Sequence, residues 1–88
     1  MKRSCIEKKV REVLKETFQY NKGVKGKTIA YKTSFIADLD FETSDMVEFL
    51  YQLDRKFGIR IRKSDDVSTF GTLVHSIMIG VTHRRIKP

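Results

Sequence analysis

The stretch Ser34-Phe-Ile-Ala-Asp-Leu-Asp-Phe-Glu-Thr-Ser-Asp-Met-Val-Glu-Phe-Leu-Tyr-Gln-Leu-Asp-Arg-Lys-Phe57 decides the fold of this 88-residue chain. The window from Thr33 to Asp54 contains six acids and no Lys or Arg, although the whole chain has a formal net charge of +7. A mixed surface would already keep a small domain soluble, so charge separated this sharply predicts a functional surface. The acids are Asp38, Asp40, Glu42, Asp45, Glu48 and Asp54.

Apolar residues recur with the period of a helix in three parts of the chain, and no part shows the sustained alternation that is typical of a strand. We expect helices at about 4–18, 43–56 and 69–80, and therefore an all-α fold. A long Gly- and Lys-rich surface connection at 19–32 and a short extended segment at 59–63 join them, with one further helical turn past 64–66. The expected core positions are Ile6, Val10, Val13, Leu14 and Phe18, then Val47, Leu50, Leu53 and Phe57, then Phe70, Leu73, Val74, Ile77 and Met78.

Individual residues mark where these helices begin and end. Ser4 is a candidate N-cap of the first helix. Gly58 is the expected stop signal of the second helix, and Gly80 that of the third. The third helix is expected to be capped near Ser68 or Thr69, and a basic tail follows it from about residue 81.

Length and composition suit a single domain spanning residues 1–88, because 40% hydrophobic and 10% aromatic residues allow one modest core. The single cysteine, Cys5, is expected to pack beside the first apolar stripe. It makes no disulfide and no metal-ligand cluster with the scattered His75 and His83. No apolar run approaches the roughly 20 residues of a membrane span, and cations interrupt any secretory signal near the N-terminus. We therefore expect a monomeric cytoplasmic protein.

Catalytic motifs are weak in this sequence. The segment 21–28 ends like a phosphate-binding loop, but Asn21 replaces the first glycine of that motif and no strand precedes it. The carboxylates of the acidic window have no predicted cleft that would suit them to acid–base work. His75, on the third predicted helix, has no predicted partners and is interpreted as structural. The residues therefore give no argument for an enzyme.

The stretch from Ser34 to Phe57 resembles the acyl carrier protein family. The family pattern is a short apolar lead into Asp-Leu, a few residues, then Asp-Ser-Leu-Asp, Val-Glu and an apolar helix that ends in Phe. The segments 4–10 and 67–77 resemble the first and last helices of the family. The resemblance implies a small four-helix bundle with a long loop after the first helix. The matching positions are Phe35, Asp38, Leu39, Asp45, Val47, Glu48, Leu53 and Phe57.

The chain departs from this pattern at the residue that is modified in carriers. Where carriers have Asp-Ser-Leu, this chain has Glu42-Thr43-Ser44. The resemblance implies that Thr43, or Ser44 one position further on, receives a 4′-phosphopantetheine from coenzyme A, whose thiol then carries an acyl group. A helix start favours an anion, but the extra methyl of threonine restricts χ1 and crowds the oxygen. The structural alternative is that both residues only cap the second helix.

The acids of the window have a second implied role. In the family, the start and face of the second helix dock basic patches on the phosphopantetheinyl transferase and on acyl-processing enzymes. By analogy, Asp38, Asp45 and Glu48 would make these contacts, and Met46 would add an apolar one. The structural alternative is compensation of the helix dipole together with solvation. Further along, cations stand where carriers are usually acidic, namely Arg55, Lys56, Arg60, Arg62 and Lys63.

These observations predict a non-catalytic carrier of an acyl or related group on a phosphopantetheine arm. The first alternative is an unmodified carrier fold that acts as a protein-interaction module. The second is a basic protein that contacts the phosphates of a nucleic acid or an anionic membrane, although the acidic window would repel the same polyanion. The cations on which this second alternative depends are Lys22, Lys25, Lys27 and Lys32, the run Arg60 to Lys63, and Arg84, Arg85 and Lys87.

Overall fold

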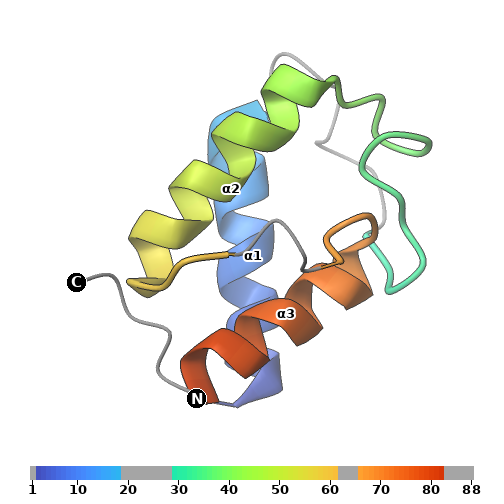
Figure 1. Cartoon of the computed structure of the whole chain (residues 1–88). Coiled ribbons are helices and arrows are strands. Elements are labelled where there is room, and N and C mark those ends of the chain that lie inside the picture. Colours follow the sequence, from blue (N-terminus) through green and yellow to red (C-terminus); the bar gives the residue numbers. More distant parts are fainter. Residues whose placement is uncertain (1, 19–28, 62–65, 83–88) are drawn as a thin grey trace.

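A computed structural model describes residues 2–18, 29–61 and 66–82. These residues form three helices: α1 (Arg3–Phe18), α2 (Thr43–Phe57) and α3 (Phe70–Thr82). α1 packs against both other helices, and the loop that leads into α2 arches away from the bundle (Figure 1). The prediction of an all-α fold is thus confirmed. The fourth helical turn expected past 64–66 is not confirmed, since 62–65 lie outside the described residues and 66–69 are not helical.

The buried face of α1 is the predicted one. Ile6, Val10 and Leu14 have no exposed surface, and Val13 and Phe18 are also buried. Cys5 is exposed, so its predicted packing role is wrong. It lies one position before Ile6, and a step of one residue turns a side chain by about 100° around the helix axis.

The buried face of α2 is the predicted one only in part, since Leu53 is buried as expected but Val47 is not. Phe49 and Leu53 form its centre with no exposed surface, whereas Val47 is 64% exposed. Leu50 and Phe57 are only partly buried. Val47 is two residues from Phe49, about 200° around the helix, so the two side chains cannot both face α1.

Both ends of α2 have well-defined caps. Glu42 is the N-cap, and its side chain accepts a hydrogen bond from the backbone N–H of Asp45, while the Asp45 carboxylate accepts one from Glu42 N–H. The predicted capping role of Thr43 and Ser44 is therefore wrong, because both lie inside the helix. At the other end, Gly58 adopts a left-handed conformation with φ 65°, which confirms the predicted stop signal.

The start of α3 is as predicted, but its end is not. Thr69 Oγ1 accepts a hydrogen bond from Thr72 N–H at 3.2 Å, as a capping side chain does. Gly80 does not end the helix; it is buried within it, and α3 continues to Thr82. A glycine inside a helix costs only about 1 kcal/mol, which packing of the neighbouring apolar residues outweighs.

Four phenylalanines connect the loop before α2 to the helices. Phe35 and Phe41 come from the loop, Phe18 from α1 and Phe49 from α2, and all four are buried. The closest ring pair, Phe18 and Phe41, has centroids 4.6 Å apart, and Phe35 and Phe49 meet edge to face at 5.2 Å. Such pairs add about 0.5–1.5 kcal/mol beyond the burial of their area. The aromatic cluster therefore holds the acidic loop on the core.

A short backbone pairing fixes the same loop against the start of α3. Ser34 and Thr69 form an isolated antiparallel bridge. Phe35 N–H donates to the Ser68 carbonyl at 3.2 Å, and Phe70 N–H donates to the Thr33 carbonyl at 3.0 Å. The residues before this bridge and those after it make different kinds of contact with the rest of the chain.

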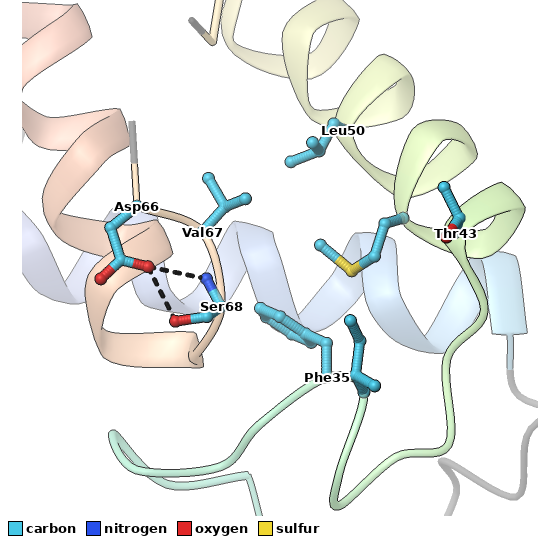
Figure 2. Close-up of a pocket in the computed structure, with 8 residues that line it drawn as sticks. Phe35, Thr43, Leu50, Asp66, Val67 and Ser68 are labelled. Atoms are coloured by element: carbon cyan, nitrogen blue, oxygen red, sulfur yellow. Dashed lines mark hydrogen bonds between the residues drawn. The ribbon is translucent and has the colours of Figure 1, made fainter. Parts of the chain in front are cut away.

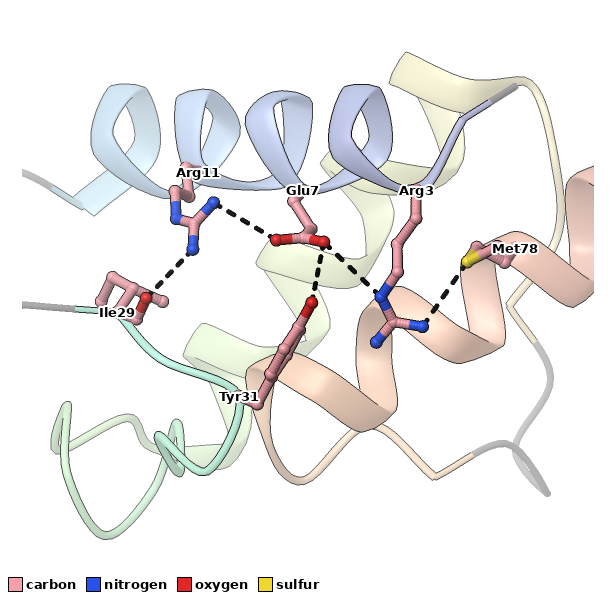
Figure 3. Close-up of polar contacts among 6 residues, drawn as sticks. All are labelled: Arg3, Glu7, Arg11, Ile29, Tyr31 and Met78. Atoms are coloured by element: carbon pink, nitrogen blue, oxygen red, sulfur yellow. Dashed lines mark hydrogen bonds and ion pairs between the residues drawn. The ribbon is translucent and has the colours of Figure 1, made fainter.

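On one side of the bridge, which we call the anchored side, residues 29–33 are tied to α1 through Glu7 and Arg11 (Figure 3). They are tied to α3 by the Gly71 N–H, which donates to the Tyr31 carbonyl at 3.0 Å. The Glu7 carboxylate accepts a hydrogen bond from the Tyr31 hydroxyl at 3.1 Å and forms ion pairs with Arg3 at 3.5 Å and Arg11 at 3.7 Å. Arg11 also donates to the Ile29 carbonyl at 3.1 Å. A single carboxylate thus joins two arginines of α1 to the loop.

Candidate functional site

Thr43 and Ser44, the two candidate attachment residues, are the first two residues of α2, and both are exposed. Backbone N–H groups in the first turn of a helix have no acceptor within the helix, and the helix dipole adds a partial positive charge there. Two carboxylates, those of Glu42 and Asp45, flank the pair through their reciprocal cap. An anion attached here would therefore meet the favourable helix end and, beside it, two negative side chains.

The two hydroxyl residues differ in what lies next to them. Thr43 lines an apolar pocket of about 370 Å³ that opens beside the start of α2 (Figure 2). Ser44 is not among the residues that line it. Thr43 therefore combines an exposed position with direct access to apolar space.

Three segments of the chain line this pocket. We call the region that they form the open side of the bridge. They are the loop at Phe35 and Ile36, the first two turns of α2, and the segment 66–68 that precedes α3. Leu50 projects from α2 toward Val67 (Figure 2), and Met46 also lines the pocket. The lining residues are Phe35, Ile36, Thr43, Met46, Leu50, Asp66, Val67 and Ser68.

Asp66 shapes the rim of the pocket. Its carboxylate accepts hydrogen bonds from the backbone N–H of Ser68 at 3.0 Å and from the Ser68 hydroxyl at 2.7 Å. These bonds to Ser68, the backbone bond first, lower the pKa of the Asp66 carboxyl below its ordinary value. The charged form of Asp66 thus holds the turn 66–68 beside the apolar opening.

The four predicted docking residues have different surroundings. Asp38 accepts a hydrogen bond from Ser34 N–H at 2.6 Å, and Asp45 takes part in the α2 cap. Met46 lines the pocket, where its side chain is partly buried. Glu48 is exposed, and its carboxylate accepts a hydrogen bond from Gln52 at 3.0 Å. Asp45, Met46 and Glu48 therefore lie together on the first half of α2, and Asp38 lies apart in the loop.

Sequence reasoning missed two exposed residues of α2, Val47 and Tyr51. They are 64% and 51% exposed, four residues apart on the same side of the helix. Arg55 places its guanidinium 5.8 Å from the centroid of the Tyr51 ring. The available signal was Phe49: once it is placed in the core with Leu53, Val47 and Tyr51 must point away.

The remaining candidate features give little more. His75 is exposed on α3, and the described residues contain no group of three or more His, Cys, Asp or Glu that could hold a metal ion. Lys32 and Arg60 are exposed. The other cations of the predicted polyanion surface lie outside the described residues, namely Lys22, Lys25, Lys27, Arg62, Lys63, Arg84, Arg85 and Lys87. Within residues 2–18, 29–61 and 66–82, no helix is long and apolar enough to cross a membrane.

Comparison with known proteins identifies a relative that covers most of the chain. No family model matches the chain. The chain is 31% identical over 71 residues to an acyl carrier protein of Lactobacillus acidophilus, and the alignment covers 78% of this chain and 84% of that protein. An identity of this level over most of both chains, together with the helical fold, shows that the chain belongs to the acyl carrier protein family.

Proposed function

We propose that this acyl-carrier-like protein carries an acyl or related group on a 4′-phosphopantetheine arm attached to Thr43. Membership of the family makes it a non-catalytic carrier and not an enzyme. The observation that carries the proposal is the position of Thr43, exposed at the first residue of α2 and lining the apolar pocket. Ser44 is equally exposed but has no such neighbour.

The residues around Thr43 would act on the phosphate at one end of such an arm and on the cargo at the other. Thr43 Oγ1 would form the new P–O bond as the diphosphate bond of coenzyme A breaks, with loss of the hydroxyl proton and departure of adenosine bisphosphate. The first-turn N–H groups and the helix dipole would stabilise the attached phosphate, and Glu42 and Asp45 would oppose it. When bound, the arm supplies a terminal thiol that holds the cargo as a thioester.

The pocket would shelter an apolar cargo next to its point of attachment. Its lining comes mainly from Phe35, Ile36, Met46, Leu50 and Val67. Removal of apolar surface from water contributes about 25 cal/mol per Å², so a hydrocarbon chain gains stability by entering it. The proposed partners are a phosphopantetheinyl transferase and acyl-processing enzymes, which would meet the carrier at α2 in the cytoplasm.

Intact mass measurement tests the attachment directly. The full-length protein is incubated with coenzyme A and a broad-specificity phosphopantetheinyl transferase, and modified peptides are mapped. We expect a gain of one phosphopantetheine on the wild type at Thr43, retained in Ser44→Ala and lost in Thr43→Ala. Thr43→Ser is the positive control, because serine lacks the methyl that crowds the hydroxyl.

The second candidate function is an unmodified protein-interaction module. The observation that favours it is the threonine itself, whose β-branch hinders a transferase shaped for serine. Modification of Thr43→Ser alone would support this module and overturn the carrier proposal for that transferase. Modification of the wild type at Ser44 would keep the carrier function but overturn the assignment to Thr43.

A further inference from the structure

We propose that the exposed face of α2 is a docking surface of two charge signs, and that it fits a partner enzyme whose surface presents cations, then an apolar recess, then carboxylates. The proposal rests on the proposed carrier function and names the kind of partner that such a carrier would select. The partner's cations would contact Glu48, and its apolar recess would hold Val47 and Tyr51. Its carboxylates would pair with Arg55 and Lys56.

A single stripe of α2 carries the apolar part of this surface. Val47, Tyr51 and Arg55 are spaced four residues apart, so they share one side of the helix over about 12 Å. Val47 and Tyr51 are more than half exposed, on a helix whose opposite side holds the fully buried Phe49 and Leu53. The guanidinium of Arg55 lies 5.8 Å from the Tyr51 ring centroid, within cation–π range.

The sign of the exposed charge changes along this stripe. Glu48 is exposed in the first half of α2, whereas Arg55 and Lys56 are exposed in the last turn and Arg60 is exposed just after it. The one acid of the second half, Asp54, is half-buried and accepts a hydrogen bond from Ile61 N–H at 3.1 Å. Its carboxylate therefore holds the turn after the helix.

Compensation of the helix dipole explains only part of this pattern. Acids in the first turn and cations in the last turn stabilise any helix. The dipole gives no reason to leave a valine and a tyrosine exposed between them, because exposed apolar surface is a cost that a partner removes. Two apolar side chains between charges of opposite sign match the usual anatomy of an interface, with an apolar centre and a polar rim.

The charge pattern also disfavours one class of partner. A uniformly basic enzyme patch would attract Glu48 but would place its own cations against Arg55 and Lys56. Juxtaposed like charges slow association and weaken binding to the wrong partner. A partner with charges of both signs avoids this repulsion, and its carboxylates would pair with the cations of the last turn.

Two synthetic helical peptides with the same central leucines test this inference. One has lysines in one half and glutamates in the other, and the second has lysines in both halves. Each is titrated into the full-length, unmodified protein at low ionic strength, and backbone amide chemical shifts are followed by NMR. We expect the split-charge peptide to bind several-fold more tightly and to shift the amides of Val47, Tyr51 and Arg55.

Matched variants separate this docking face from net charge. Arg55→Glu combined with Lys56→Glu should reverse the preference between the two peptides. Lys8→Glu combined with Lys15→Glu changes the net charge equally at two exposed positions of α1 and should leave the preference as in the wild type. Equal affinity of the wild type for both peptides, or the same reversal in both variants, would overturn the proposal.

A second copy of the chain is the other occupant that the experiment detects. Concentration-dependent broadening of the α2 amides without peptide, with a dimer in light scattering, would overturn the enzyme-docking proposal in favour of self-association. Because the peptides bind unmodified protein, this result does not depend on Thr43. If the wild type gains no phosphopantetheine but still prefers the split-charge peptide, the attachment of the arm is refuted and the docking surface is supported.

Discussion

The anchored side and the open side flank the same backbone bridge, yet they are built from different interactions. On the anchored side, Glu7 joins Arg3, Arg11 and Tyr31 through a hydrogen bond and two ion pairs. Arg11 also lies 4.6 Å from the centroid of the Phe70 ring. On the open side, the segments around Thr43 meet mainly through apolar side chains and leave a pocket of about 370 Å³.

The two sides of the bridge therefore differ in how strictly they fix the conformation of the chain. Directional polar contacts hold residues 29–33 in one arrangement, because each bond specifies a partner and a geometry. Apolar contacts around the pocket specify no single geometry, so a flexible side chain such as Met46 would be able to adjust to the proposed cargo. The proposed carrier role would use both properties: a loop fixed in place and an opening beside Thr43.

The largest expected effect is on the core that both sides share. Phe49→Ala should lower the free energy of unfolding by about 3–5 kcal/mol, because Phe49 is fully buried and contacts the rings of Phe18, Phe35 and Phe41. Chemical denaturation of both proteins measures the difference. Val47→Ala on the same helix is the matched control, with an expected change within about 0.5 kcal/mol.

Equal losses in these two variants would contradict the assigned orientation of α2. The comparison of the two sides would then fail as well, since Met46 and Leu50 face the pocket only if Phe49 faces the core.

The anchored side can be tested at Gly71, the second residue of α3. A Cβ at this position would lie 3.0 Å from the Tyr31 carbonyl oxygen, which itself accepts a hydrogen bond from Gly71 N–H. Overpacking costs about 1–3 kcal/mol, and replacing a helical glycine by alanine returns up to about 1 kcal/mol. Because Glu7 holds Tyr31 in place, we expect Gly71→Ala to reduce the free energy of unfolding by about 1 kcal/mol.

Thermal and chemical denaturation of Gly71→Ala provide the measurement. Gly58→Ala is a useful reference, because nothing lies within 4 Å of its added Cβ and any loss there comes from its φ of 65°. An increase in stability for Gly71→Ala would mean that residues 29–33 move aside, and the anchored side would then be no firmer than the open side.

Much of the fold was predictable because helical periodicity reports burial directly. All five apolar positions of α1 were predicted correctly, as were Gly58 as a helix end and Thr69 as a cap. The α2 face was predicted in part, because Leu53 is buried and Leu50 and Phe57 pack against the core. Val47 was placed there wrongly and Phe49 was missed, since only contact with the aromatic cluster shows that Phe49 faces inward. Gly80 was misread for a similar reason, since packing in three dimensions overrides the local cost of glycine.

The candidate site was predictable as a position but not as a cavity. The motif around Glu42-Thr43-Ser44 pointed to the start of α2, and the structure has both hydroxyl residues exposed there. The sequence left the choice between Thr43 and Ser44 open, because Thr43 has the position of the family serine and Ser44 has its side chain. That distinction depends on the pocket, whose walls come from segments more than 20 positions apart, such as Thr43 and Val67.

The smallest expected effect concerns the rim of the open side. The folded state favours the charged carboxylate of Asp66, because Ser68 donates two hydrogen bonds to it and lowers its pKa below the ordinary value of 3.8. This contribution to stability is fully present at pH values above the ordinary pKa of the carboxyl. It is lost as the pH falls through the lowered pKa that Asp66 has in the folded protein. Asp66→Asn keeps an acceptor oxygen but removes the charge, so the wild type should be slightly more stable than Asp66→Asn at about pH 7. This difference should shrink toward zero as the pH falls through the lowered pKa of Asp66.

Denaturation midpoints of wild type and Asp66→Asn, followed from about pH 7 into the acidic range, measure this difference, because effects of the other carboxylates cancel between the two proteins. Glu16→Gln, at an exposed position of α1 away from the rim, controls for the loss of one negative charge. A difference that grows on acidification would contradict the assigned sign. A difference that shrinks as expected would show that the open side has its own polar restraint, confined to the turn 66–68 and leaving the apolar walls of the pocket free to adjust.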